Sequence, residues 1–115
     1  MVAYVSDSFK KEIVQRMFRN FLDIMILNIV QDEPTWGYQI IKHVEEKYDI
    51  RLRHGALYPL LNNLERKQLL KRRKEAKGGR VRKVYEITSK GIQVVIAFNE
   101  FLQDYLQEQN TKTGI

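Results

Sequence analysis

Residues 51–90 gather the side chains best suited to bind phosphate groups and base edges. This stretch holds 13 Lys and Arg residues against three acidic ones, while the rest of the chain holds seven basic and eleven acidic residues. The net charge of +6 therefore combines one strongly basic block with mildly acidic flanks. Basic side chains bind nucleic acids by neutralising phosphates and releasing counterions. Because the charge is concentrated, we expect this block to bind double-stranded DNA.

Leucines at helical spacing predict a helix over residues 54–67. Its apolar side consists of Leu57, Leu60, Leu61 and Leu64, and its polar side of His54, Asn62, Asn63 and Arg66. Asparagine can hydrogen-bond adenine edges and arginine guanine edges, so the polar side can read bases in a major groove. Proline deep inside a helix costs about 3 kcal/mol. Pro59 should therefore lie in or near the first turn, and the helix should not begin much before His54.

Two strands are predicted after this helix, over Leu69–Ala76 and Arg82–Thr88. The loop between them, Lys77–Val81, contains two glycines, and we expect a hairpin longer than the two-residue kind. Residues 71–87 would form a basic wing on the DNA backbone or in the adjacent minor groove. Its tip supplies phosphate contacts from Lys77, Arg80, Arg82 and Lys83, with Gly78 and Gly79 allowing close approach.

The segments on either side of the basic block read as helices. Residues 7–31 form one helix or two, and in the second case Asn20 would cap a helix beginning at Phe21. Thr35 is a good N-cap for the next helix, whose first turn can meet a phosphate. Thr88 should cap a last helix running from about Ser89 to Gln109, with a frayed tail after Asn110.

Three helices followed by a β-hairpin is the order of a winged helix-turn-helix, a mainly α fold with a small β-hairpin (α+β). The third helix would enter the major groove. We expect three parts: an N-terminal helical extension over residues 1–20, a DNA-binding domain over 21–88, and a C-terminal dimerisation helix with its tail over 89–115.

The last helix carries an apolar seam of Val95, Phe98, Leu102 and Tyr105, with Phe101 on a second stripe beside it. An isolated helix with two apolar stripes must bury them, and self-association is the simplest way to do so. We expect a dimer core here rather than a ligand site. A two-fold dimer would place two recognition helices about 34 Å apart on a near-palindromic DNA site.

Several short motifs resemble those of the PadR family of transcriptional regulators. They are Trp36-Gly37-Tyr38, Gly55-Ala56-Leu57-Tyr58-Pro59-Leu60-Leu61, Leu64-Glu65, Gly78-Gly79-Arg80 and Tyr85-Glu86-Ile87-Thr88 followed by Gly91. The resemblance covers about residues 21–92 and implies a homodimeric winged-helix repressor that binds a palindromic operator. In such proteins the C-terminal helix dimerises, often against the N-terminal helix, which here presents Phe9, Ile13 and Met17. The chain looks like a short form of the family with one C-terminal helix.

The sequence departs from the family pattern at two places. Arg53-His54 precedes Gly55, where the family often has a serine near the start of the recognition helix. The C-terminal helix carries Phe98, Phe101 and Tyr105 rather than the tryptophan that lines a drug-binding pore in several members. A small-molecule effector is therefore possible but unsupported.

Together, these patterns and the resemblance give a set of expected DNA-binding residues. They are Thr35, Tyr38, Arg51, Arg53, His54, Gly55, Ala56, Tyr58, Pro59, Asn62, Asn63, Arg66, Lys77, Gly78, Gly79, Arg80, Arg82 and Lys83. For Tyr58, packing and a phosphate contact are both open. Two other classes of function stay open as well: a sequence-neutral architectural DNA-binding protein, and a basic module that binds an acidic protein.

Other classes of function find little support in the composition. Cysteine is absent, which removes disulfides and thiolate chemistry, and neither histidine has further metal ligands nearby. No nucleophile triad or phosphate loop is visible, so we expect no enzyme, cofactor or metal. Apolar runs fall far short of the ~20 residues of a membrane span. No signal peptide is visible, and the expected location is the cytoplasm.

Overall fold

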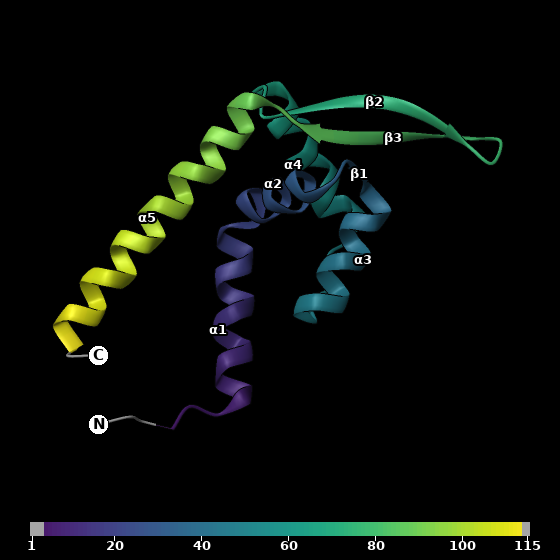
Figure 1. Ribbon diagram of the computed structural model, residues 1–115. Helices are drawn as coiled ribbons and strands as arrows, with labels where there is room; N and C mark the ends of the chain where they lie inside the picture. The colour runs from purple at the N-terminus through teal and green to yellow at the C-terminus, as the bar shows by residue number, and fades with distance from the viewer. Residues whose placement is uncertain (1–3, 114–115) are drawn as a thin grey trace.

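The computed structural model describes residues 4–113, which form an elongated molecule of 59 × 30 × 21 Å. Its elements are α1 (Asp7–Asn20), α2 (Leu22–Asp32), β1 (Thr35–Trp36), α3 (Gly37–Tyr48), α4 (His54–Arg66), β2 (Leu70–Lys77), β3 (Arg80–Ile87) and α5 (Ser89–Thr113). The hairpin of β2 and β3 projects at one end, while α1 and α5 extend away from it (Figure 1). The expected α+β fold with a winged helix is confirmed.

The core lies where α2, α3 and α4 meet the base of the hairpin. Its fully buried side chains include Ile26, Leu27, Ile40, Val44, Leu57, Leu61 and Tyr85. The predicted apolar side of α4 is confirmed, since Leu57, Leu61 and Leu64 are buried and Leu60 is partly buried. Burying one such leucine contributes roughly 1.5–3 kcal/mol. This packing holds α4 beneath the sheet and leaves its polar side exposed.

The N-terminal segment forms two helices rather than one. Phe21, not Asn20, lies between them, and its backbone N–H donates to the carbonyl of Met17. Asn20 instead donates its side-chain amide to the carbonyl of Arg16, so the expected Asn20 cap is wrong. The N-cap of α1 is Ser6, which accepts from the N–H of Phe9.

A third strand, β1, was not predicted, and it changes the assignment of Thr35. Thr35 pairs with Tyr85 and Trp36 with Val84, giving an antiparallel sheet of order β1-β3-β2. Helix α3 therefore begins at Gly37 with Trp36 in the N-cap position. The prediction of Thr35 as N-cap is wrong because strand pairing to β3 fixes its backbone in an extended conformation.

The hairpin is tighter than the sequence suggested. Lys77 and Arg80 pair directly across the ladder, leaving a two-residue turn of Gly78 and Gly79. Their φ angles of 60° and 75° are left-handed, as such a turn requires. The expected longer loop over Lys77–Val81 is therefore wrong, and both strands run on to the glycines.

Helix α5 begins as predicted and ends later. The hydroxyl of Thr88 accepts from the N–H of Gly91 at 3.0 Å and donates to the carbonyl of Gln68 at 2.7 Å. This confirms Thr88 as the cap and ties the start of α5 to the turn that follows α4. Residues 111–113 are helical, so a frayed tail after Asn110 is wrong for them, and residues 114–115 lie outside the described part.

A bilayer-crossing segment would need a long apolar helix, and none of the helices within the described residues meets that requirement.

Candidate nucleic-acid interface

The exposed side of α4 is polar, as predicted. His54, Asn62 and Arg66 are exposed, and Asn63 is partly buried. The helix starts after Arg53, and no side chain caps the N–H groups of His54 and Gly55, while those of Ala56 and Leu57 donate to the Arg53 carbonyl. Pro59 lies in the second turn, slightly deeper than expected, and the helix continues through it. The arrangement presents hydrogen-bonding side chains along one face of a straight element, as groove reading requires.

Helix α3 begins beside this face, and its first turn also lacks a side-chain cap. Tyr38 is 54% exposed there, in keeping with its expected role. Thr35 is only 6% exposed, and its hydroxyl donates to the side-chain oxygen of Gln39 at 2.8 Å. The expected phosphate contact of Thr35 is therefore withdrawn, because its hydroxyl is buried and already bonded.

Tyr58 connects the starts of the two helices. Its hydroxyl lies 2.6 Å from the place where a Cβ at position 37 would stand, so any larger residue there would displace the Tyr58 ring. Its ring stacks on that of His54, with centroids 5.7 Å apart and planes 12° apart. Tyr58 is 38% exposed, so it packs and still presents an edge to solvent.

The hairpin divides into two parts by charge pairing. We call residues 70–75 and 84–87 the wing base, and residues 76–83 the wing tip. In the base, Arg73 pairs with Glu75 and Glu86, Lys71 with Glu86, and Arg72 with Glu65 of α4. A hydrogen bond from Arg73 lowers the pKa of the Glu86 carboxyl below its usual range. These charges are largely compensated within the protein.

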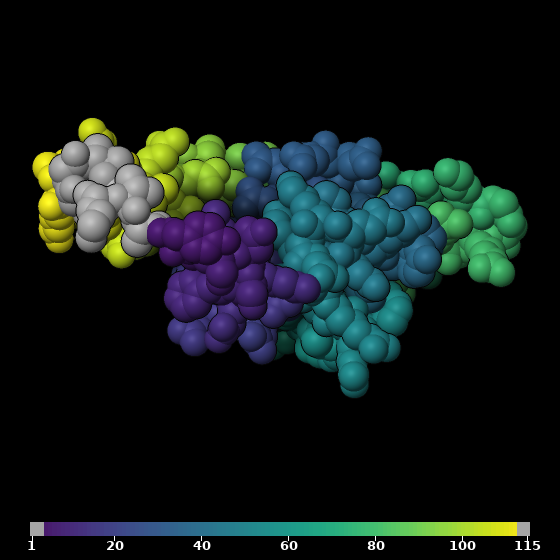
Figure 2. All heavy atoms as spheres, turned by 90° about the horizontal axis from the view of Figure 1, so that it is seen from below, coloured from purple at the N-terminus to yellow at the C-terminus, as the bar shows by residue number. Residues whose placement is uncertain are grey.

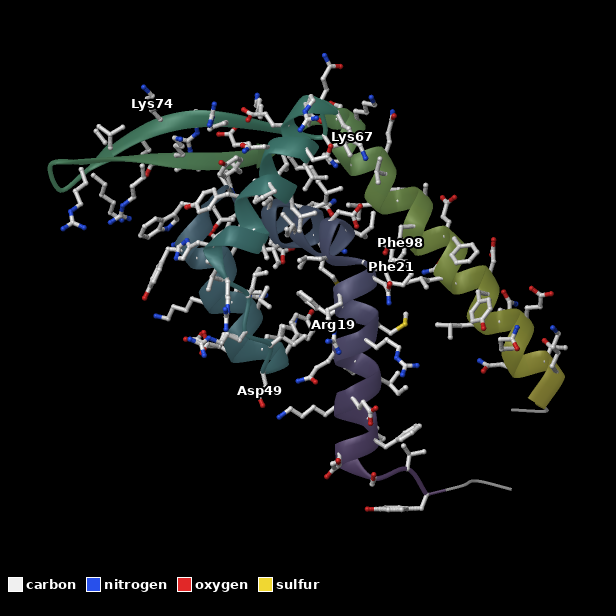
Figure 3. All side chains as sticks on the ribbon, turned by 180° about the vertical axis from the view of Figure 1, so that it is seen from behind. Arg19, Phe21, Asp49, Lys67, Lys74 and Phe98 are labelled. Atoms are coloured by element: carbon white, nitrogen blue, oxygen red, sulfur yellow. The ribbon has the colours of Figure 1, made fainter. Side chains whose placement is uncertain are left out.

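The wing tip shows the opposite pattern. Among residues 4–113, no acidic side chain pairs with Lys77, Arg80, Arg82 or Lys83. Lys74, at the outer end of the base, also lacks such a partner and points away from the body of the domain (Figure 3). The unpaired charge is thus concentrated at the end of the hairpin. This end, in green, projects beyond the rest of the molecule in the space-filling view (Figure 2).

A groove of about 450 Å³ runs between the wing tip and the two helix starts. Its lining consists of Trp36, Gly37, Tyr58, Arg80, Val81, Arg82 and Lys83. The guanidinium carbon of Arg82 lies 3.8 Å from the centre of the Trp36 ring. Three basic side chains and a tyrosine hydroxyl on one groove suit a phosphate group.

Some expected residues lie elsewhere. Arg51, Arg53 and Ala56 line a separate groove of about 430 Å³, formed with α1 and α2. Two residues of the wing groove were missed: Trp36, and Val81, which is 68% exposed at the wing tip. Trp36 is the only tryptophan of the chain and directly precedes Gly37-Tyr38, and this motif is the sequence signal that could have identified it.

The expected dimer surface is exposed in most of its parts. Phe9, Ile13 and Met17 of α1 and Phe101 and Tyr105 of α5 are exposed, and Phe98 and Leu102 are partly buried. Phe98 contacts Phe21, with ring centroids 5.4 Å apart (Figure 3). Val95 is only 2% exposed and belongs to the core. Its assignment to the dimer seam is corrected, because the protein's own core already buries it.

Within the described residues, no group of three or more His, Cys, Asp or Glu side chains is placed to hold a metal ion. The acidic side chains of the hairpin serve its ion pairs instead.

Comparison with known proteins gives one family and many similar structures. The family described as "Transcriptional regulator PadR-like family" matches residues 26–96, more than half of the chain. A PadR-like transcriptional regulator from Bacillus cereus is 27% identical, with a TM-score of 0.69, covering 86% of this chain and 94% of that one. A PadR-like transcription factor from Bacteroides fragilis is 26% identical, with a TM-score of 0.73 and coverages of 87% and 97%.

A PadR family transcriptional regulator from Eggerthella lenta shares the fold at 24% identity, with a TM-score of 0.73 and coverages of 93% and 94%. The comparison with curated protein sequences returned no match.

Proposed function

Because the chain belongs to the PadR-like family of transcriptional regulators, we propose that it is a homodimeric repressor that binds a near-palindromic operator. Members of this family are DNA-binding regulators rather than enzymes. The direction of regulation, the symmetry of the operator and the dimer are the proposed parts.

The observation that supports this function best is the separation of paired and unpaired charge in the hairpin. The four basic side chains of the wing tip lack acidic partners among residues 4–113. Three of them, Arg80, Arg82 and Lys83, line one groove together with Tyr58 of α4. We place α4 in the major groove and the wing tip on the backbone or in the adjacent minor groove. The proposed contacts are Tyr38, His54, Gly55, Tyr58, Pro59, Asn62, Asn63, Arg66, Lys77, Gly78, Gly79, Arg80, Arg82 and Lys83.

Dimerisation is assigned to the two helices outside the DNA-binding part, residues 1–20 and 89–115. Exposed apolar side chains on α1 and α5 need a partner surface, and a second copy supplies matching ones. Within residues 21–88, Arg51, Arg53 and Ala56 are proposed as secondary phosphate contacts, since Arg51 and Arg53 are exposed without acidic partners in the described chain.

One experiment tests the proposal directly: selection of bound fragments from genomic DNA, followed by binding measurements on the enriched sequence and on random duplex. We expect a near-palindrome with half-sites about one helical turn apart. Replacing Asn62 and Asn63 by alanine should reduce discrimination between the two duplexes by about 10-fold or more, since a good base contact contributes roughly 1–3 kcal/mol.

An equal loss on both duplexes, or enrichment of no common sequence, would instead indicate a sequence-neutral architectural protein. The matched control is Gln103→Ala on α5, an exposed polar position far along the chain from the reading helix. It should leave discrimination unchanged.

A further inference from the structure

We propose that Trp36 is a platform that holds the guanidinium of Arg82 in position to bind one backbone phosphate of duplex DNA. The inference rests on the DNA binding proposed above and adds Trp36 to it as a positioning residue. The phosphodiester group would lie in the groove between the wing tip and the starts of α3 and α4.

The Trp36 ring is held in place by the backbone on either side. Trp36 pairs with Val84 in the sheet and is the N-cap residue of α3, so two elements fix its position. The ring is partly buried and contacts that of Tyr38, with centroids 5.6 Å apart. A side chain so constrained can serve as a fixed surface for another.

Arg82 differs from the other basic residues of the hairpin. Lys71, Arg72, Arg73, Lys74, Lys77, Arg80 and Lys83 are exposed, whereas Arg82 is partly buried. Its register partner across the ladder is Glu75, yet Glu75 pairs with Arg73 at 2.7 Å. No acidic side chain within residues 4–113 pairs with Arg82, so the aromatic face is the contact that orders it.

Stacking leaves the binding groups of arginine free. Its five N–H donors lie in the guanidinium plane, so a ring against the flat face does not block them. Two of them can bind a phosphate side by side, and a guanidinium already ordered loses less freedom on binding. A flexible lysine would lack both properties.

The surroundings favour a phosphate as the group that Arg82 binds. Arg80, Lys83 and the Tyr58 hydroxyl line the same groove, and the uncapped first turn of α3 begins at its edge. All of these groups favour an anion with several acceptor oxygens. A guanine edge also accepts from arginine, but it is neutral, so the three cationic side chains on this groove favour a charged phosphate.

The stack is tested first in the free protein. Trp36 is the only tryptophan, so fluorescence excited at the long-wavelength edge of its absorption, where the six tyrosines do not absorb, reports on its surroundings alone. Arg82→Leu should change the intensity or the emission maximum, while Lys83→Leu, which removes a charge from the same groove, should change neither. Identical emission from wild type and Arg82→Leu would overturn the platform, whatever the DNA results.

A double-mutant cycle on duplex DNA then tests whether Trp36 acts through Arg82. Trp36→Leu should weaken binding about three- to fivefold, the scale of a partly exposed cation–π contact. It removes no charge, yet the salt slope should fall toward that of Arg82→Leu, which loses about one unit per bound protomer. Trp36→Phe should restore most of the affinity, because it keeps an aromatic face.

The combined variant Trp36→Leu/Arg82→Leu should bind no more weakly than Arg82→Leu alone. Trp36→Leu with Lys83→Leu should instead show additive losses. The platform would be overturned if the losses of Trp36→Leu and Arg82→Leu were additive, or if Trp36→Leu left the salt slope unchanged. In either case, binding of duplex DNA by the wild-type protein would leave the proposed function standing. A wild-type protein that binds no duplex at low salt would overturn both.

Discussion

The wing base and the wing tip carry similar densities of positive charge and differ in what that charge contacts. In the base, Lys71, Arg72 and Arg73 pair with glutamates, and Tyr85 reaches into the core. In the tip, the basic side chains lack acidic partners within the described residues, and Val81 is exposed. One half of the hairpin thus anchors the wing and the other is available to DNA. Charge counted along the sequence overstates the binding surface, because pairing decides which charges remain for a ligand.

The largest effect should come from the core side of the wing base. Tyr85→Ala is expected to lower the free energy of unfolding by about 3–5 kcal/mol, since it empties a fully buried aromatic site. Val81→Ala, four residues earlier on the same strand, should cost less than about 1 kcal/mol. Denaturant unfolding of both variants measures the contrast, and equal losses would remove the distinction between base and tip.

A second effect concerns DNA affinity. Replacing Lys77, Arg80 and Lys83 by alanine should weaken binding to every duplex about a hundredfold at 0.15 M salt and reduce the salt slope by about three units per bound protomer. Lys71→Ala with Arg73→Ala removes two charges from the base, and it should leave the slope nearly unchanged because Glu75 and Glu86 compensate them. Fluorescence anisotropy across a salt series gives both numbers. A base variant that lost slope as steeply as the tip variant would show that paired charges also contact DNA.

The smallest effect is a pH dependence of the wing base. A hydrogen bond from Arg73 lowers the pKa of Glu86 in the folded protein. The ion pairs therefore stabilise the fold above the unfolded-state pKa of Glu86, and this contribution is lost as the pH falls through the lowered folded-state pKa. Because Glu86 pairs at the surface, the change in stability should be small. A carboxyl NMR titration should find Glu86 below its usual range in wild type and near it in Arg73→Ala.

Local signals in the sequence predicted local structure well. Thr88 caps α5 because a threonine hydroxyl reaches an N–H three residues on, a contact that needs no distant partner. The leucine spacing in α4 predicted its buried side because helical periodicity is also a local property of the sequence. The polar side followed directly, which is why most of the proposed reading residues are exposed.

Contacts between distant segments could not be predicted in this way. Thr35 has the chemistry of a cap, but pairing with Tyr85, fifty residues away, places it in a strand. Val95 fits the periodicity of an interface seam, yet periodicity does not show whether the core or a second copy buries a residue. The separation of paired from unpaired charge likewise depends on cross-strand register, and so does the approach of Arg82 to Trp36.

The two-glycine turn has a consequence for how this protein can change. Every residue from Leu70 to Lys77 has a partner between Arg80 and Ile87, so the ladder is continuous up to the turn. Inserting one residue into either strand would move all following side chains to the opposite face. Insertions and deletions in this hairpin should therefore be tolerated when two residues are added to, or removed from, each of the two strands together. Each such step would lengthen the reach by about 7 Å, close to the width of a minor groove.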